Sequence, residues 1–141
     1  MDCIRSVRLN WSKLVRLLVI LPIGSSTAAS AQTEMGACGL EAGIWGKSSA
    51  VCALASRPDE AARQFGGSAL LEWERRNYVQ DGNICGIFTN EIESSNCTIT
   101  FECGRAMGHT NVEIISSHEM RFGIGAASTY IYCGKGQLPV R

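Results

Sequence analysis

Hydrophobic and polar side chains alternate along short segments in the second half of the chain. The clearest segment is 97–103, where cysteine and apolar residues occupy every second position and threonine or glutamate the others. Strict alternation is typical of a half-buried strand in an antiparallel sheet. Turn residues separate such segments at intervals of roughly 8–12 residues, which favours a small sandwich or barrel. The predicted strands are 69–74, 84–88, 97–103, 112–116, 119–124 and 128–133, with turns at 81–83 and 93–95 and a loop at 104–111.

Helical signals precede the strands. Residues 48–55 predict a short helix. At 56–60 a serine that can cap, an early proline and two acidic residues indicate a second helix start, and two glycines follow Phe65 as its end. Residues 32–46 are glycine-rich and predict a loop that turns toward the core at 44–45. We therefore predict a mainly β fold, a small antiparallel barrel or sandwich with one or two short helices.

The first 31 residues have the organisation of a secretory signal peptide. Four basic residues lie within the first 16 positions, an apolar stretch covers 14–23, and small residues lead to Ala31. This order predicts cleavage after Ala31. A membrane-spanning helix needs about 20 apolar residues, and the apolar run here is about half as long. We expect one domain at 32–141 in a periplasmic or secreted protein, with no stable membrane insertion after cleavage.

Composition narrows the function classes. The chain has 141 residues, of which 45% are hydrophobic and 18% are charged. This length suits one domain, and this hydrophobic content argues against disorder. Residues 1–31 carry four of the 13 basic and one of the 13 acidic residues, which leaves nine and twelve and a mature net charge of −3. A mildly acidic protein does not have the profile of a nucleic-acid binder and is weakly attracted to cationic partners.

Cysteine is the strongest chemical signal. The chain has 7 cysteines, and Cys3 is removed with the signal peptide. An even number of cysteines in a short exported chain predicts three disulfides. A structural zinc site needs more closely spaced ligand pairs than Cys97 and Cys103, so we expect no metal and no other cofactor. The six cysteines of the mature chain are Cys38, Cys52, Cys85, Cys97, Cys103 and Cys133.

Strand geometry restricts the pairing of these cysteines. Cys97 and Cys103 lie on one predicted strand and would be roughly 20 Å apart, whereas a disulfide needs Cα atoms within about 7 Å. Folding the strand 84–88 back around the turn at 93–95 would place Cys85 near Cys103, which favours that pair. A Cys52–Cys133 bridge would tie the early segment to the last strand and leave Cys38–Cys97. The pairing of these last four cysteines stays open.

No residue pattern indicates a catalytic site. His109 and His118 fall in a predicted loop and a predicted turn, and the chain has no hydrolase, zinc-protease or phosphate-loop motif. Glu72 and Glu74 alternate with apolar residues and should lie on the solvent face of a strand. The arginines at 75–76 are too few for a phosphate-binding patch. We expect no enzymatic activity, with a small secreted hydrolase that uses a histidine as one alternative.

The last part of the chain carries a motif of possible function. Residues 122–130 read Phe-Gly-Ile-Gly-Ala-Ala-Ser-Thr-Tyr, and a Lys-Gly pair follows at 135–136. The segment 122–141 resembles the bacterial periplasmic inhibitors of c-type lysozyme, which are small exported β-barrels with a Ser/Gly-rich loop that ends in an aromatic residue. It departs from that family at Phe122, at Ala127 and in the short spacing to the Lys-Gly pair. The cysteines and the Tyr-x-Cys pattern also resemble small exported proteobacterial Cys-containing β proteins of unknown function.

The resemblance implies a binding protein rather than an enzyme. Its matched positions are Ser128, Tyr130 and Lys135, and we add the neighbouring Arg121. The implied mechanism is insertion of a rigid loop around 121–135 into the active-site cleft of a cationic cell-wall hydrolase, where a basic side chain would meet the catalytic carboxylates. The alternative is a structural or adhesive envelope or surface protein without such a loop.

Overall fold

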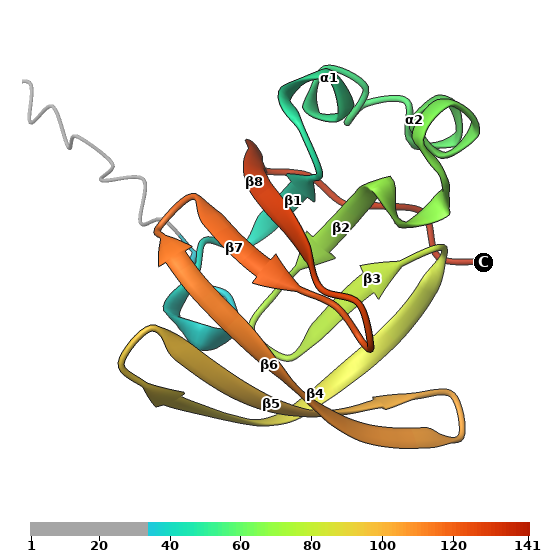
Figure 1. Cartoon of the computed structure of the whole chain (residues 1–141). Coiled ribbons are helices and arrows are strands. Elements are labelled where there is room, and N and C mark those ends of the chain that lie inside the picture. Colours follow the sequence, from blue (N-terminus) through green and yellow to red (C-terminus); the bar gives the residue numbers. More distant parts are fainter. Residues whose placement is uncertain (1–33) are drawn as a thin grey trace, which may run out of the picture. The chain divides into compact units, whose positions relative to one another are not determined.

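The computed structural model describes residues 34–141, so the predicted signal peptide and its cleavage site lie outside the described residues. Antiparallel strands form a closed barrel, in which each strand pairs with its neighbours in sequence and the last pairs with the first (Figure 1). The predicted mainly β fold is confirmed, as a barrel rather than a sandwich. The strands are β1 (Gly43–Gly46), β2 (Leu70–Trp73), β3 (Asn77–Gln80), β4 (Asn83–Glu93), β5 (Asn96–Cys103), β6 (Ala106–Ser116), β7 (Glu119–Phe122) and β8 (Ser128–Gly134).

Side chains fill the interior of the barrel. Along β5 the buried residues Cys97, Ile99 and Phe101 alternate with more exposed ones, as predicted. Eight strands enclose a space just wide enough for side chains to fill. The ring centroid of Trp73 lies 6.0 Å from that of Tyr78 and 5.3 Å from that of Phe122. The interior is therefore a packed core.

A second and smaller apolar cluster lies outside the barrel. The helices α1 (Ser49–Cys52) and α2 (Pro58–Phe65) follow β1 and lie beside β1 and β2 (Figure 1). The Oγ atom of Ser48 accepts a hydrogen bond from the Val51 N–H and caps α1. Both helices were predicted from the sequence. No helix within residues 34–141 has the length and hydrophobicity to cross a bilayer. The cluster consists of Ile44, Val51, Leu54, Ala61, Ala69 and Leu70. The chain also forms two short 3-10 helical turns, η1 (Ala37–Gly39) and η2 (Gly67–Ala69).

Three disulfides cross-link the fold, one within a hairpin and two between segments that are distant in the sequence. Cys85–Cys103 links directly opposed positions of β4 and β5, as strand geometry favoured. Cys52–Cys133 ties α1 to β8, and Cys38–Cys97 ties η1 to β5. All three pairs are those considered from the sequence. Residues 34–42, here named the cap segment, pack against one end of the barrel through the buried Ala37, Cys38 and Leu40, and we name this end the cap end.

The predicted loop at 104–111 is wrong. Only Gly104 and Arg105 form a turn, and β6 pairs with β5 from Ala106 onward, so that His109 lies on a strand. Gly104 has φ +62°, which permits a two-residue turn. The small and polar residues that follow resemble a loop in composition, but they belong to a strand that projects past its neighbour β7. The strand predicted at 119–124 ends at Phe122.

The prediction that Glu72 faces solvent is also wrong. Its side chain is on the outer side of β2, yet Glu72 is only 4% exposed because the C-terminal tail crosses over it. The backbone N–H of Leu138 donates to Glu72 Oε2 at 2.5 Å. Burial raises the pKa of Glu72, the hydrogen bond from Leu138 lowers it, and the neighbouring Glu74 raises it, with a net rise.

We expect two substitutions of Glu72 to distinguish the effect of its charge on stability from the effect of its hydrogen bond with Leu138. Because the folded-state pKa is raised, the folded protein holds the proton more tightly, and this contribution to stability falls as the pH rises from about 4.5 through the folded-state pKa. Glu72→Gln keeps an acceptor for Leu138 and should flatten that dependence without loss of stability at pH 7. Glu72→Ala leaves the N–H without its acceptor and should cost about 1–3 kcal/mol. Urea unfolding between pH 4 and 8 measures both effects, and an unchanged pH slope in Glu72→Gln would contradict this role.

Candidate functional site

The residues predicted to form one inserting loop do not lie together. β7 contains Arg121, the connecting loop is 123–127, and β8 begins at Ser128. β8 spans 7 residues at about 3.3 Å each, so Ser128 and Lys135 are separated by more than about 20 Å. The interpretation of 121–135 as one loop is therefore wrong. Lys135 lies at the cap end, whereas Arg121 and Ser128 flank the loop toward the opposite end.

Tyr130 is a core residue. It is 2% exposed, and its hydroxyl donates to the Ser68 carbonyl and accepts from Gln80 Nε2, both at 2.8 Å. Burial raises the pKa of Tyr130 to about 12. A partner cannot contact this ring on the barrel surface, so the role of Tyr130 is to position β8. Its place after a glycine-rich segment suggested a loop aromatic, but strand pairing with Met120 turns it inward.

Arg121 is an outward-facing residue of β7. Its Nη1 lies 3.2 Å from Glu113 Oε2 on the adjacent strand β6. Both side chains are about half exposed, so this pair is worth little to stability and can exchange for another acidic partner. Arg121 is thus the one basic side chain of the predicted set that lies beside the β7–β8 loop.

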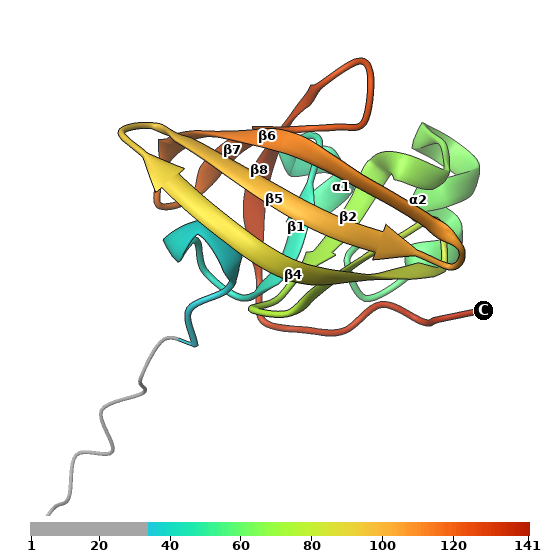
Figure 2. The same cartoon turned by 90° about the horizontal axis from the view of Figure 1, so that it is seen from below.

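The β7–β8 loop projects from the barrel (Figure 2). The Gly123 carbonyl accepts a hydrogen bond from Thr110 Oγ1 at 3.1 Å, which ties the start of the loop to β6. A Cβ atom on Gly123 would lie 2.6 Å from the Ala126 carbonyl oxygen, so the loop doubles back closely at this glycine. Ile124 is 62% exposed. The structure therefore presents a narrow loop of small residues with one apolar side chain.

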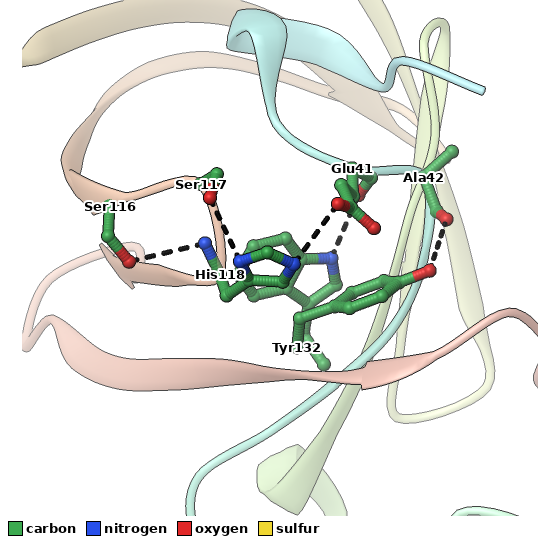
Figure 3. Close-up of polar contacts among 7 residues, drawn as sticks. Glu41, Ala42, Ser116, Ser117, His118 and Tyr132 are labelled. Atoms are coloured by element: carbon green, nitrogen blue, oxygen red, sulfur yellow. Dashed lines mark hydrogen bonds and ion pairs between the residues drawn. The ribbon is translucent and has the colours of Figure 1, made fainter. Parts of the chain in front are cut away.

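Figure 3 shows a polar cluster where the β6–β7 turn meets the cap segment. His118 Nε2 lies 3.1 Å from Glu41 Oε1, and His118 Nδ1 lies 2.9 Å from Ser117 Oγ. The Tyr132 ring centroid is 5.7 Å from that of His118, and the Trp45 indole N–H donates to the Glu41 carbonyl at 3.1 Å. Burial, and then Glu41, raise the pKa of Tyr132. The sequence placed His118 in a turn but carried no signal for Glu41, which is distant along the chain.

Serine, histidine and glutamate in one hydrogen-bonded chain are the elements of a nucleophile relay. Such a relay also requires donors for an oxyanion and a cleft that excludes water. The His118 side chain is 60% exposed, and none of the three principal cavities within residues 34–141 is lined by Ser117 or His118. The geometry therefore supports an anchor that holds the turn to the cap segment. Within the same residues no cluster of three side chains is arranged to bind a metal.

No family model, curated protein or solved structure matches this chain. Two regions of the described chain differ from a plain barrel surface. One is the projecting β7–β8 loop, and the other is the cap end, where Lys135 lines a hollow of about 200 Å³ with Glu34 and Glu74. The arginines of the β2–β3 turn line an adjoining hollow.

Proposed function

We propose that the protein is an exported binding protein that inhibits a cell-wall hydrolase, with the β7–β8 loop inserted into the active-site cleft of the hydrolase. The observation that carries the proposal is the loop itself, a narrow glycine-containing turn that stands out from a packed barrel. Its residues 123–127 lie at the start of the segment 122–141 that resembles inhibitors of c-type lysozyme. The partner would be a protein, and the mechanism needs no cofactor.

The loop would act mainly by shape and through its backbone. Residues 123–127 carry no charge, and small residues let the backbone approach the walls of a cleft closely. Arg121 beside the loop could exchange Glu113 for a catalytic carboxylate of the hydrolase, whereas Lys135 is too distant to take part. The Thr110 hydrogen bond ties the start of the loop to β6, which lowers the entropy lost on binding. The net charge of −3 on residues 32–141 favours encounter with a cationic hydrolase.

A lysis assay with matched variants tests this proposal. The oxidised protein should inhibit a c-type lysozyme that acts on cell walls, and Ile124→Asp should weaken inhibition about 30-fold or more, since a charge would be buried at the centre of the contact. Ile92→Asp is the control, because Ile92 is similarly exposed (56%) at the far end of β4. Lys135→Ala should also leave inhibition unchanged.

Two outcomes would reject the proposal. One is the absence of inhibition by protein shown to be folded and disulfide-bonded. The other is equal loss of inhibition in Ile124→Asp and Ile92→Asp, which would mean that the loop is not the contact. Binding to envelope or surface material without inhibition would instead support the structural or adhesive alternative.

A further inference from the structure

A groove at the cap end lies between the cap segment and the β2–β3 turn. Its volume is about 720 Å³, within the range of roughly 300–1,000 Å³ that is usual for small-ligand sites. The charged side chains Glu34, Glu74, Arg75 and Arg76 line it. The hollow of about 200 Å³ beside Lys135 shares Glu34 and Glu74 as walls, so the two hollows adjoin. Arginines line only the larger hollow, Lys135 lines only the smaller one, and the two glutamates line both.

None of these five charged side chains is paired within the described chain. The ion pairs of residues 34–141 join Arg57 to Glu60, His118 to Glu41, Arg121 to Glu113 and Arg141 to Asp59, and none of them lies in the groove. Opposite charges therefore line these adjoining hollows without a direct ion pair between them. A ligand that carries both signs of charge would complement them.

The turn that presents the arginines differs from three of the other hairpin turns, although the β6–β7 turn also has no residue with positive φ. The turns of β3–β4, β4–β5 and β5–β6 each use a residue with positive φ, namely Asp81 with Gly82, Ser94 and Gly104. The β2–β3 turn, closed by the Glu74 N–H to the Asn77 carbonyl at 2.9 Å, has arginine at both central positions and no positive φ. Turn geometry does not require arginine, and two adjacent like charges oppose each other. The requirements of folding therefore do not explain why two arginines occupy this turn.

The walls of the groove are held rigidly. The Ala37 N–H donates to the Glu74 carbonyl at 2.9 Å, and the Ala42 N–H donates to the Glu34 carbonyl at 2.9 Å. A Cβ atom on Gly36 would lie 2.8 Å from Trp73 Cδ1, so the cap segment rests directly on the core. The Cys38–Cys97 disulfide fixes the same segment. A ligand would therefore meet a site that is already formed.

We infer that this groove binds a short peptide that carries both free carboxylate and free ammonium groups. Arg75 and Arg76 bind a carboxylate, for which the planar guanidinium is suited through paired hydrogen bonds. Glu34 and Glu74 accept an ammonium group, and Lys135 binds a second carboxylate. The groove is at the end of β8 opposite the β7–β8 loop, so peptide binding is separate from the proposed inhibition and does not rest on it.

Two-dimensional NMR tests this inference by titration of a peptide into the protein. The full chain is produced in a compartment where its disulfides form. The probe is the tetrapeptide Ala-Glu-Lys-Ala with free termini, which has two positive and two negative groups. We expect chemical-shift changes confined to residues 34–36, 42–43, 74–77 and 135–137, and weaker binding at higher salt. The same tetrapeptide with acetylated and amidated ends should bind at least tenfold more weakly.

Variants identify the groups that bind. The double variant Arg75→Ala/Arg76→Ala should weaken binding at least tenfold, and Arg75→Lys/Arg76→Lys should weaken it several-fold because paired hydrogen bonds are lost. The control is Arg63→Ala/Arg105→Ala, which removes two arginines that do not line the groove. Shift changes absent or spread over the surface would overturn the inference. Triglutamate that binds as tightly as the tetrapeptide would also overturn it, because the site would then be only a cationic patch. No hydrolase is present in this experiment, so its outcome is independent of the lysis assay.

Discussion

Replacement of both Cys52 and Cys133 by serine should lower the free energy of unfolding by about 4 kcal/mol. The bridge closes a segment of 81 residues, and in the chain-entropy relation a loop of that length restricts the unfolded chain by about 4–5 kcal/mol. The other two bridges shorten the effective loop, but the logarithmic dependence makes that correction small. Small domains have a total stability of about 5–15 kcal/mol, so the variant would lose a large part of it.

The Cys85–Cys103 bridge supplies the matched control. It closes only 18 residues, and the same relation assigns it about 3 kcal/mol. Moreover, the paired strands β4 and β5 already hold its two ends opposite each other. Guanidinium unfolding of the two double-serine variants should therefore show the larger loss for Cys52 and Cys133. An equal or larger loss for Cys85 and Cys103 would show that loop closure does not govern the stabilisation.

Trp73→Ala should destabilise the fold by about 3–5 kcal/mol. Trp73 is fully buried, and its ring contacts Tyr78 and Phe122 at the centre of the barrel. Its indole N–H donates to the Ala37 carbonyl at 2.9 Å, so the ring also holds the cap segment in place. Truncation removes this packing, leaves a cavity and deprives that carbonyl of its donor.

Phe88→Ala is the comparison for Trp73→Ala. Phe88 is an exposed aromatic residue at an irregularity in the pairing of β4 with β5, and its truncation should change stability by less than about 0.5 kcal/mol. Both values come from denaturant unfolding of the oxidised proteins. A loss of less than about 1.5 kcal/mol in Trp73→Ala would contradict the view that the barrel interior is one packed core.

The strand and helix pattern was predictable because its causes are local. Alternation along 97–103 follows from the period of two in a strand, and α2 follows from an early proline and a terminal glycine. The Cys85–Cys103 bridge was predictable for the same reason, since one hairpin turn determines which positions of β4 and β5 are opposed. These features depend on residues within a few positions or within one hairpin.

The errors arose where a distant segment covers or pairs with a local one. Glu72 has the pattern of a solvent-facing residue, but the C-terminal tail covers it. Residues 104–111 have the composition of a loop, but β5 pairs with most of them. Tyr130 resembles a loop aromatic, but its pairing with Met120 directs it into the core. In each case a contact between segments distant in the sequence decided the environment of the side chain.

The sequence by itself determined the β class, the helix positions and an even set of six cysteines in residues 32–141. Only the tertiary structure decided that Lys135 is far from the β7–β8 loop and that Glu41 meets His118. It also decided that unpaired charges of the cap segment, the β2–β3 turn and the end of β8 border two adjoining hollows. The physical reason is that local periodicity and backbone preference act over a few residues. Barrel closure and strand register set distances between segments, and no local pattern encodes them.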